Sequence, residues 1–218
     1  MVMKWSWPPL WPDFRYLYRR CLGRGAMARR RARRPPRATR LLGQSWRVPE
    51  LGKVTLNSAS QDICRAIDEE WVPLRPPSDV QHAWRWADIE ASLRETFVLM
   101  LDGKPIGIWG SKKGSPMPLQ EGVFYRFDFV EGHPKYRGGG QVLGLFLLAT
   151  AAARANELGA SGIVLAAFDV KGLIEFYTSA GAEQRLIEGW TCPDNLVPLV
   201  IGPKAFKDLL EFSDDIIE

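Results

Sequence analysis

Residues suited to binding an anion gather between positions 124 and 159. Phe124 to Val130 is rich in aromatic and β-branched residues and predicts a strand. An apolar run from Val142 to Leu158 predicts a helix that ends at Gly159. Between them lies a basic, glycine-rich turn that contains Lys135, Arg137, Gly138, Gly139 and Gly140. The first N–H groups of a helix have no partner within it, and glycines let a phosphate come close to them, so this order predicts an anion site.

Two common phosphate-binding loops do not fit this turn. A Walker loop needs Gly-Lys-Ser/Thr four residues after a glycine, and the stretch has no such sequence. A dinucleotide fingerprint that starts at Gly138 and Gly140 needs a glycine at position 143. The sequence has Leu143 there, and the next glycine is Gly144. The turn is therefore typical of neither loop.

A third pattern matches the turn more closely. Arg137, Gly140 and Val142 stand at the places of an Arg-x-x-Gly-x-Gly/Ala motif, and Val142 departs from the small residue at its last place. The turn resembles the loop of the GNAT acetyltransferases, whose successive amides hold the pyrophosphate of acetyl-CoA. The resemblance implies that acetyl-CoA is the co-substrate. It implies binding by Phe129, Val130, Lys135, Arg137, Gly138, Gly139, Gly140, Gln141 and Val142.

The segments after the turn extend the resemblance to about residues 96–201. Residues 162–168 form a continuous apolar run that predicts a strand buried on both faces. Phe176, Tyr177 and Gly181 match the family's Phe-Tyr helix, although Ala182 replaces its usual Phe and the Asn near its start is absent. The resemblance implies an α/β GNAT fold. This is a mixed, mostly antiparallel sheet with a splay between two parallel central strands and helices on both faces.

Three residues are candidates for proton transfer. An amine must be neutral to attack a thioester, so a carboxylate acting directly or through a water is the usual base. Asp128 and Glu131 are the candidates, and either could equally be a surface charge or half of an ion pair with Arg126. The resemblance places Tyr177 beside the acetyl sulfur, where it would protonate the departing thiolate. The alternative for Tyr177 is a core aromatic with a backbone partner.

The remaining patterns predict the elements that must position these residues. Alternation along the aromatic strand predicts two faces, one with Phe124, Arg126, Asp128 and Val130 and the other with Tyr125, Phe127, Phe129 and Glu131. Trp84, Trp86, Trp109 and Trp190 are candidates for an acceptor pocket or for core packing. The predicted elements are a strand at 54–56, a helix capped by Ser60 that runs through Glu70, a helix at 79–95, a hairpin of 96–101 and 106–111, late strands at 183–190 and 196–201, and a closing helix at 204–212.

Charge divides the chain into two parts. Residues 1–40 contain twelve Lys or Arg and a single acid, Asp13, whereas the remainder has 17 basic and 24 acidic residues. We therefore predict a basic, Trp-, Pro- and Arg-rich extension at residues 1–45 and one domain at 46–218. The extension has four possible interpretations. It could be a solvated tail (or translation could start at Met27 instead of Met1), a segment that contacts RNA or DNA, an anchor on an anionic membrane, or a transit peptide.

Composition narrows the function classes. The longest apolar run falls short of the roughly 20 residues that cross a membrane, and the three cysteines form neither a disulfide framework nor a metal pattern. We therefore expect a cytoplasmic monomer or homodimer without a metal. The leading hypothesis is acetyl-CoA-dependent transfer of an acetyl group to an amine. The alternatives are an inactive GNAT-like acyl-CoA-binding or interaction module and a nucleic-acid-associated protein that acts through the arginine-rich tail.

The glycine turn yields a first prediction. We expect Gly140→Asp to abolish acetyl-CoA binding, because the new carboxylate would stand against the pyrophosphate. Isothermal titration calorimetry of the variant and the wild-type chain measures the loss. Binding of wild-type strength in the variant would contradict the assignment of this turn as the pyrophosphate loop.

Overall fold

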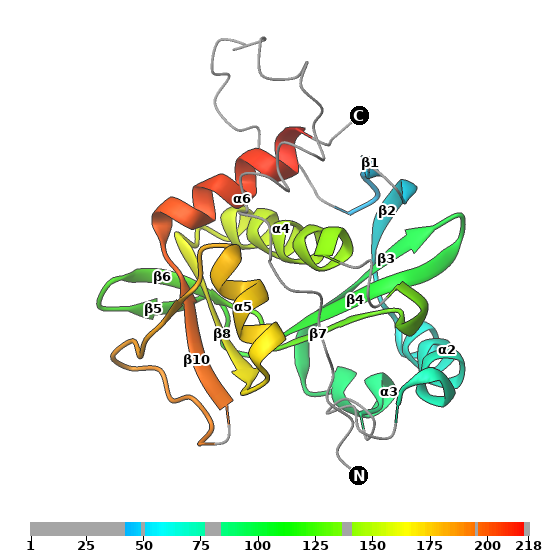
Figure 1. Ribbon diagram of the computed structural model, residues 1–218, viewed down its shortest axis with the longest axis horizontal. Helices are drawn as coiled ribbons and strands as arrows, with labels where there is room; N and C mark the ends of the chain where they lie inside the picture. The colour runs from blue at the N-terminus through cyan, green and yellow to red at the C-terminus, as the bar shows by residue number, and fades with distance from the viewer. Residues whose placement is uncertain (1–41, 49–50, 77–83, 137–140, 195, 216–218) are drawn as a thin grey trace.

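Two five-stranded sheets stand side by side in the computed structural model of the chain, which describes residues 42–48, 51–76, 84–136, 141–194 and 196–215 (Figure 1). The first sheet has the order β1-β2-β3-β4-β7 and the second β5-β6-β8-β10-β9. The first sheet comprises β1 (Ser45–Val48), β2 (Gly52–Ser58), β3 (Leu93–Leu101), β4 (Lys104–Lys112) and β7 (Phe129–Gly132). The second comprises β5 (Met117–Leu119), β6 (Gly122–Arg126), β8 (Gly162–Phe168), β9 (Glu183–Gln184) and β10 (Leu196–Ile201).

Most of the strand pairs are antiparallel, and the sheets form the predicted mixed arrangement. The predicted hairpin is confirmed as β3 and β4, which pair from Leu93↔Lys112 to Leu101↔Lys104. Its turn residues, Asp102 and Gly103, both have positive φ, at 49° and 78°. Two successive left-handed residues give the backbone twist that matches the flanking strands, and this explains the Asp-Gly sequence.

The second sheet contains the parallel pair that the predicted splay requires. β6 runs parallel to β8, with Tyr125 opposite Ile163 and Arg126 opposite Val164. β7 continues the same stretch of chain but pairs antiparallel with β4 of the other sheet. The backbone changes partner within two residues. Phe127 N donates to Val164 O at 3.0 Å, and Asp128 N donates to Gly110 O at 3.2 Å.

This change of partner corrects the predicted alternation. Asp128 and Phe129 both stand opposite Gly110, which makes a β-bulge that adds one residue to the strand. Tyr125 and Phe127 pack in the main core, and after the bulge Val130 packs there too, while Phe129 packs in a second cluster. One extra residue exchanges the two faces of a strand, so Glu131 does not share the face of Tyr125 as alternation predicted.

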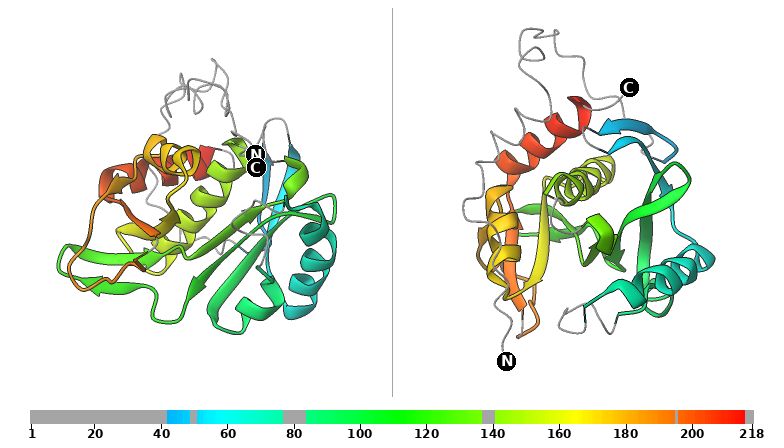
Figure 2. Two further views of the ribbon diagram at one scale, coloured as in Figure 1. Left: turned by 60° about the horizontal axis from the view of Figure 1, so that its bottom comes forward. Right: turned by 45° about the vertical axis from the view of Figure 1, so that its right-hand side comes forward.

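Helices cover the sheets on both faces (Figures 1 and 2). The helices are α2 (Gln61–Trp71), α3 (Trp86–Glu90), α4 (Gln141–Glu157), α5 (Lys171–Ser179) and α6 (Pro203–Asp215), with 3-10 turns η2 (Val72–Leu74) and η3 (Pro134–Tyr136). α4, α5 and α6 pack in the main core, whereas α2 and α3 pack on the other face of the first sheet. No helix in the described ranges has both the length and the apolar character needed to cross a bilayer.

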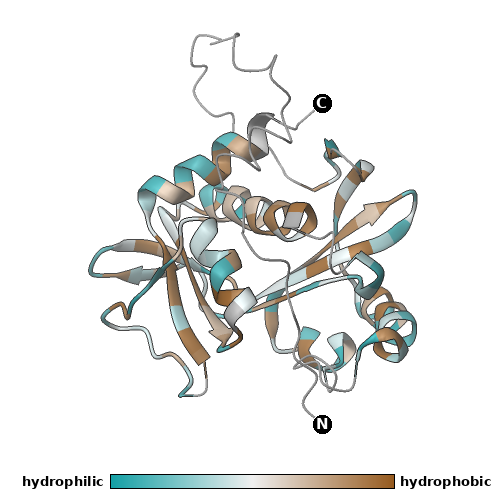
Figure 3. Cartoon of the chain, viewed as in Figure 1, coloured by the Kyte–Doolittle hydropathy of each residue, from teal (hydrophilic) through white to brown (hydrophobic). Residues whose placement is uncertain are grey.

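The long central helix α4 lies close against the first sheet because the sheet presents glycines to it. A Cβ on Gly107 would lie 2.9 Å from Leu147 Cδ2, and one on Gly132 would lie 3.0 Å from Leu143 Cδ2. Most of α4 is drawn in tan and brown, the colours of apolar residues, in Figure 3, as expected of a helix buried between sheet and helices. The predicted helix at 142–158 is confirmed within one residue, and Gly159 follows its end with φ 77°.

Two predicted elements are wrong. The helix predicted at 79–95 is helical only over Trp86–Glu90 in its described part, because the backbone of Leu93 and the next residues joins β3. The long partner β4 supplies hydrogen bonds there that outweigh helix propensity. The strand predicted at 183–190 is limited to Glu183–Gln184. By contrast, Ser60 caps α2 as predicted, since its hydroxyl accepts a hydrogen bond from Ile63 N at 3.4 Å.

A three-residue hydrogen-bonded cluster joins the two sheets on the closed side of the splay. The Tyr125 hydroxyl of β6 donates to Glu95 Oε1 of β3 at 2.6 Å. Arg154 of α4 donates to Glu95 Oε2 from Nε at 3.1 Å and from Nη2 at 2.8 Å. Burial and the neighbouring carboxylate raise the pKa of Tyr125 above its ordinary value, so the hydroxyl stays a donor. One residue from each sheet and one from α4 are thus tied together.

We predict that Tyr125→Phe lowers the free energy of unfolding by about 1.5–3 kcal/mol, the usual contribution of a hydrogen bond to a charged partner. Urea denaturation measures the change. Tyr136→Phe is the control, because its hydroxyl has no hydrogen bond to another described residue, and it should change stability far less. Equal effects of the two substitutions would show that the Tyr125–Glu95 contact does not link the sheets.

Candidate functional site

A cleft of about 510 Å³ opens where β7 and β8 diverge. Its walls are formed by the chain at β7 and by β8, which do not pair with each other beyond the bulge. Asp128, Phe129 and Val130 line one side, and residues 164–168 line the other. Leu173 and Tyr177 of α5 close it on the face of the main core, and Trp84 and Trp190 line the opposite face. The splay that the resemblance implied is therefore present as a cleft, and residues from both faces of the sheets line it.

The β7 edge of the cleft presents backbone as well as side chains. His133 N donates to Ile106 O at 2.8 Å, and hydrogen-bonded pairs alternate along an antiparallel ladder. In the register that pairs Val130 with Trp109, this alternation turns the N–H and C=O of Val130 away from β4 and towards the cleft.

Tyr177 reaches the cleft from α5. Its side chain is buried, at 4% exposure, and lines the cavity beside Leu173. Burial raises the pKa of the Tyr177 hydroxyl above its ordinary value, so the group is protonated at neutral pH. No described residue forms a hydrogen bond with this hydroxyl. The chemistry open to it is therefore the donation of a proton to a group in the cleft.

α5 can approach α4 closely because α4 has a glycine at the contact. A Cβ on Gly144 would lie 3.0 Å from Cζ of Phe176, the neighbour of Tyr177. Gly144, which does not fit a dinucleotide fingerprint, thus serves helix packing. The N-cap residue of α5 is Val170, which makes no side-chain cap hydrogen bond, in agreement with the absence of Asn near the start of the helix.

Asp128 lies in the cleft and already has two partners. Its Oδ1 accepts from Arg126 Nη2 at 2.6 Å, and its Oδ2 accepts from the backbone N–H of Lys112 at 2.8 Å. The ion pair with Arg126 is the alternative that the sequence left open for this residue. The carboxylate is only 12% exposed, so it is held in place at the bulge.

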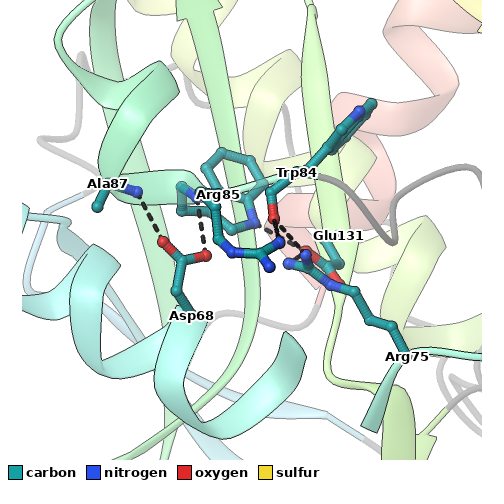
Figure 4. A network of polar contacts seen from close by, with 7 residues as sticks. Asp68, Arg75, Trp84, Arg85, Ala87 and Glu131 are labelled. Carbon is teal, nitrogen blue, oxygen red and sulfur yellow. Dashed lines mark hydrogen bonds and ion pairs between the residues drawn. The ribbon is translucent and has the colours of Figure 1, made fainter. Parts of the chain in front are cut away.

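Glu131 lies beyond the bulge, on the side of β7 that packs against α2 and α3. Arg75 grips it with two hydrogen bonds, Nε to Oε1 at 2.9 Å and Nη2 to Oε2 at 2.7 Å, and Trp86 Nε1 donates to Oε2 at 2.8 Å (Figure 4). Both charged side chains are fully buried. Burial raises the pKa of Glu131, while the hydrogen bonds from Arg75 and Trp86 act in the opposite direction. The Glu131 carboxylate thus links β7 to Arg75, which follows η2, and to Trp86 of α3.

The same network places Trp84 at the cleft. Arg75 Nη1 donates to Trp84 O, and Asp68 accepts from the N–H groups of Trp86 and Ala87 at 2.8 and 2.9 Å (Figure 4). The Trp84 ring points away from this network and lies edge-on to Phe129, with centroids 5.4 Å apart, and 6.1 Å from the centroid of Phe168. Trp84 therefore touches both walls of the splay.

The other tryptophans divide between cleft and core. Trp190 lines the cleft, as one of the two interpretations of these residues expects. Trp86 and Trp109 are completely buried, and Trp109 Nε1 donates to Thr150 Oγ1 at 3.1 Å. Sequence analysis missed Arg75 as the partner of Glu131, because nothing in the local pattern links two residues 56 positions apart.

The predicted pyrophosphate loop is described only at its ends. Arg137 and Gly138–Gly140 lie outside the described residues, whereas α4 begins at Gln141 and its first turn adjoins the end of β7 through Leu143 and Gly132. Val142 is half-buried against the main core, which accounts for a bulky residue at the motif's last place. Lys135 is exposed outside the cleft, in a shallow groove with Lys104 and Glu70.

His133 fixes the turn that leads into this loop. Its Nδ1 accepts from Lys135 N at 3.0 Å, and its Nε2 lies 3.2 Å from Glu70 Oε1. The ring also packs edge-on against Trp71 and Tyr136. His133 thus holds η3 on α2.

Solved structures share this architecture. A spermidine N-acetyltransferase SpeG chimera from Vibrio cholerae and hSSAT superposes with a TM-score of 0.53 at 14% identity, covering 71% of this chain and 98% of that one. The aminoglycoside acetyltransferase AAC(6')-Ib, in complex with coenzyme A and kanamycin, gives 0.52 at 20% identity over 71% and 98%. A GNAT-family acetyltransferase from Listeria monocytogenes gives 0.51 at 13% over 69% and 95%.

Neither a protein-family model nor a curated protein matches the chain by sequence. The similarity to the solved structures is thus one of fold. The chain has the fold of the GNAT acetyltransferases, as the sequence resemblance implied.

We predict that Arg75→Met lowers the free energy of unfolding by about 3–5 kcal/mol at neutral pH, because it leaves the buried Glu131 carboxylate uncompensated. In the variant, burial keeps the folded-state pKa of Glu131 above its unfolded value. A raised folded pKa gives stability that is present at low pH and lost as pH rises, so the deficit should shrink on acidification. Urea denaturation across pH measures both effects.

Arg65→Met is the matched control. Arg65 also pairs with a carboxylate, Asp62, but the two side chains are 57% and 88% exposed. Exposed pairs contribute about 0–1 kcal/mol, so this variant should be close to wild type. A deficit in Arg75→Met as small as that in Arg65→Met would contradict an anchoring role for the buried pair.

Proposed function

We propose that this chain, which has the fold of the GNAT acetyltransferases, transfers an acetyl group from acetyl-CoA to an amine. The observation that supports this most is the cleft between β7 and β8, which is lined by residues from both faces of the sheets and has a buried tyrosine, Tyr177, on its wall. Direct transfer needs the thioester carbon and the amine nitrogen held next to each other, and a cleft lined from both faces could hold both.

The chain offers acetyl-CoA two kinds of contact. The pantetheine arm would lie along the edge of β7 at Phe129 and Val130, which line the cleft. The N–H groups at the start of α4, together with the loop of Arg137 to Gly140, would hold the pyrophosphate, with Lys135 and Arg137 adding positive charge. Acetyl-CoA supplies the acetyl group as a thioester.

Tyr177 would act as the acid that protonates the departing thiolate. Burial raises the pKa of Tyr177, so its hydroxyl carries a proton at neutral pH. In this proposal the amine attacks the thioester directly, without a covalent enzyme intermediate.

Of the two carboxylates proposed as general base, Asp128 has the better position. It lies in the cleft, whereas Glu131 is buried outside it with Arg75 and Trp86. Asp128 could accept a proton directly or through a water, at the cost of weakening its pair with Arg126. We assign Glu131 the role of a positioning residue that fixes β7.

Binding of acetyl-CoA is the first requirement of this proposal. Millimolar acetyl-CoA should bind in calorimetry and raise the melting temperature of the full chain. A chain that shows neither effect would rule the proposal out. Binding without acetylation of any member of a broad amine panel would instead favour a non-catalytic acyl-CoA-binding module.

We predict that Tyr177→Phe lowers kcat by at least about tenfold, because it removes an acid that contributes to proton transfer, and leaves the Kd for acetyl-CoA unchanged. Thiol release measures turnover, and calorimetry measures binding. In the wild-type chain the raised pKa of Tyr177 also means that its ionisation causes no loss of kcat at moderately alkaline pH. Unchanged turnover in the variant would remove the acid role.

A further inference from the structure

Aromatic side chains line the side of the cleft that faces away from α4 and α5. α4 and α5 occupy the main-core face, so an amine that meets a thioester arm held there must enter from the opposite face. Trp84 and Trp190 flank that opening, and Phe129 and Phe168 line it from β7 and β8. All four aromatic side chains are half-buried. The entrance thus offers apolar and aromatic surface to a side group of the acceptor.

The charges at this entrance do not cancel. Of the described residues that line the cleft, only Lys112, Arg126 and Asp128 are charged. One carboxylate oxygen of Asp128 accepts a hydrogen bond from Arg126, and the other accepts one from the backbone N–H of Lys112. The Lys112 ammonium lies 5.4 Å from the centroid of the Phe129 ring, and no described carboxylate lies within ion-pair distance of it. The charged residues that line the described cleft therefore have a net charge of one positive unit.

A surplus cation has two consequences for an amine substrate. It disfavours a second cation in the same space, so a polyamine or a polycationic sugar would be repelled. It also favours the neutral form of a nearby amine, which is the form that attacks a thioester. A carboxylate on the acceptor would complement the Lys112 ammonium and the part of the Arg126 guanidinium that Asp128 does not hold.

We propose, on the basis of the function proposed above, that the acceptor is a small amine that carries a carboxylate and an apolar or aromatic group, as an apolar amino acid does. The aromatic walls receive the apolar group, and Lys112 with Arg126 receives the carboxylate. This class differs from spermidine, which the SpeG chimera acetylates by its name, and from kanamycin, which is bound to AAC(6')-Ib. It also differs from the cationic acceptor that the acidic body as a whole would suggest.

A matched pair of amines tests the proposal. Phenylalanine and 2-phenylethylamine differ by the carboxylate alone, and spermidine serves as a polycationic probe. With the full chain and saturating acetyl-CoA, we expect kcat/KM from thiol release to be highest for phenylalanine and lowest for spermidine. The intrinsic reactivities of the amines cancel when the phenylalanine to phenylethylamine ratio is compared between variants.

We expect Lys112→Met to lower that ratio about tenfold, as the loss of a charged contact predicts. Lys113→Met removes the same charge from the next residue, which is exposed and does not line the cleft, and should leave the ratio unchanged. Calorimetry should give one Kd for acetyl-CoA in all three proteins.

The outcomes separate the two proposals. Absence of acetyl-CoA binding overturns the proposed function, and this inference with it. If acetyl-CoA binds but spermidine or phenylethylamine is preferred, or no member of the set is acetylated, the carboxylate-bearing acceptor is overturned alone. An equal ratio in Lys112→Met and the wild-type chain overturns the role of Lys112.

Discussion

One extra residue in a strand shapes the whole cleft. At Phe127 and Asp128 the backbone leaves β8 and joins β4, so a single stretch of chain belongs to both sheets. Beyond this point β7 and β8 have no common hydrogen bonds and must diverge. The Val130 backbone and the Asp128 carboxylate owe their positions at the cleft to this bulge.

The divergence is held open by contacts on either side of it. Tyr125, Glu95 and Arg154 tie the sheets together where they still meet. Arg75 and Glu131 tie β7 to the helical layer where the sheets have separated. A buried ion pair is expensive to desolvate, and its value lies in fixing one geometry. Here that geometry includes the backbone that carries Trp84 to the mouth of the cleft.

Charge illustrates the difference between a protein's average and its site. The globular part of the sequence is acidic, yet the charged residues that line the described cleft are two cations and one carboxylate. Interactions between exposed charges fade over about 10 Å at ordinary ionic strength, so a substrate inside the cleft is governed by its neighbours and not by the distant surface. The acceptor class must therefore be argued from Lys112, Arg126 and Asp128.

The sequence by itself determined the elements whose signals are local. Asp102-Gly103 set the hairpin, Ser60 set the start of α2, and the glycine after the apolar run set the end of α4. Only the tertiary structure decided the faces of β7 and the partner of Glu131. A bulge depends on which strand lies alongside, and an ion pair between residues 56 positions apart leaves no periodic trace. Long-range hydrogen bonding, which no short window of sequence contains, made both choices.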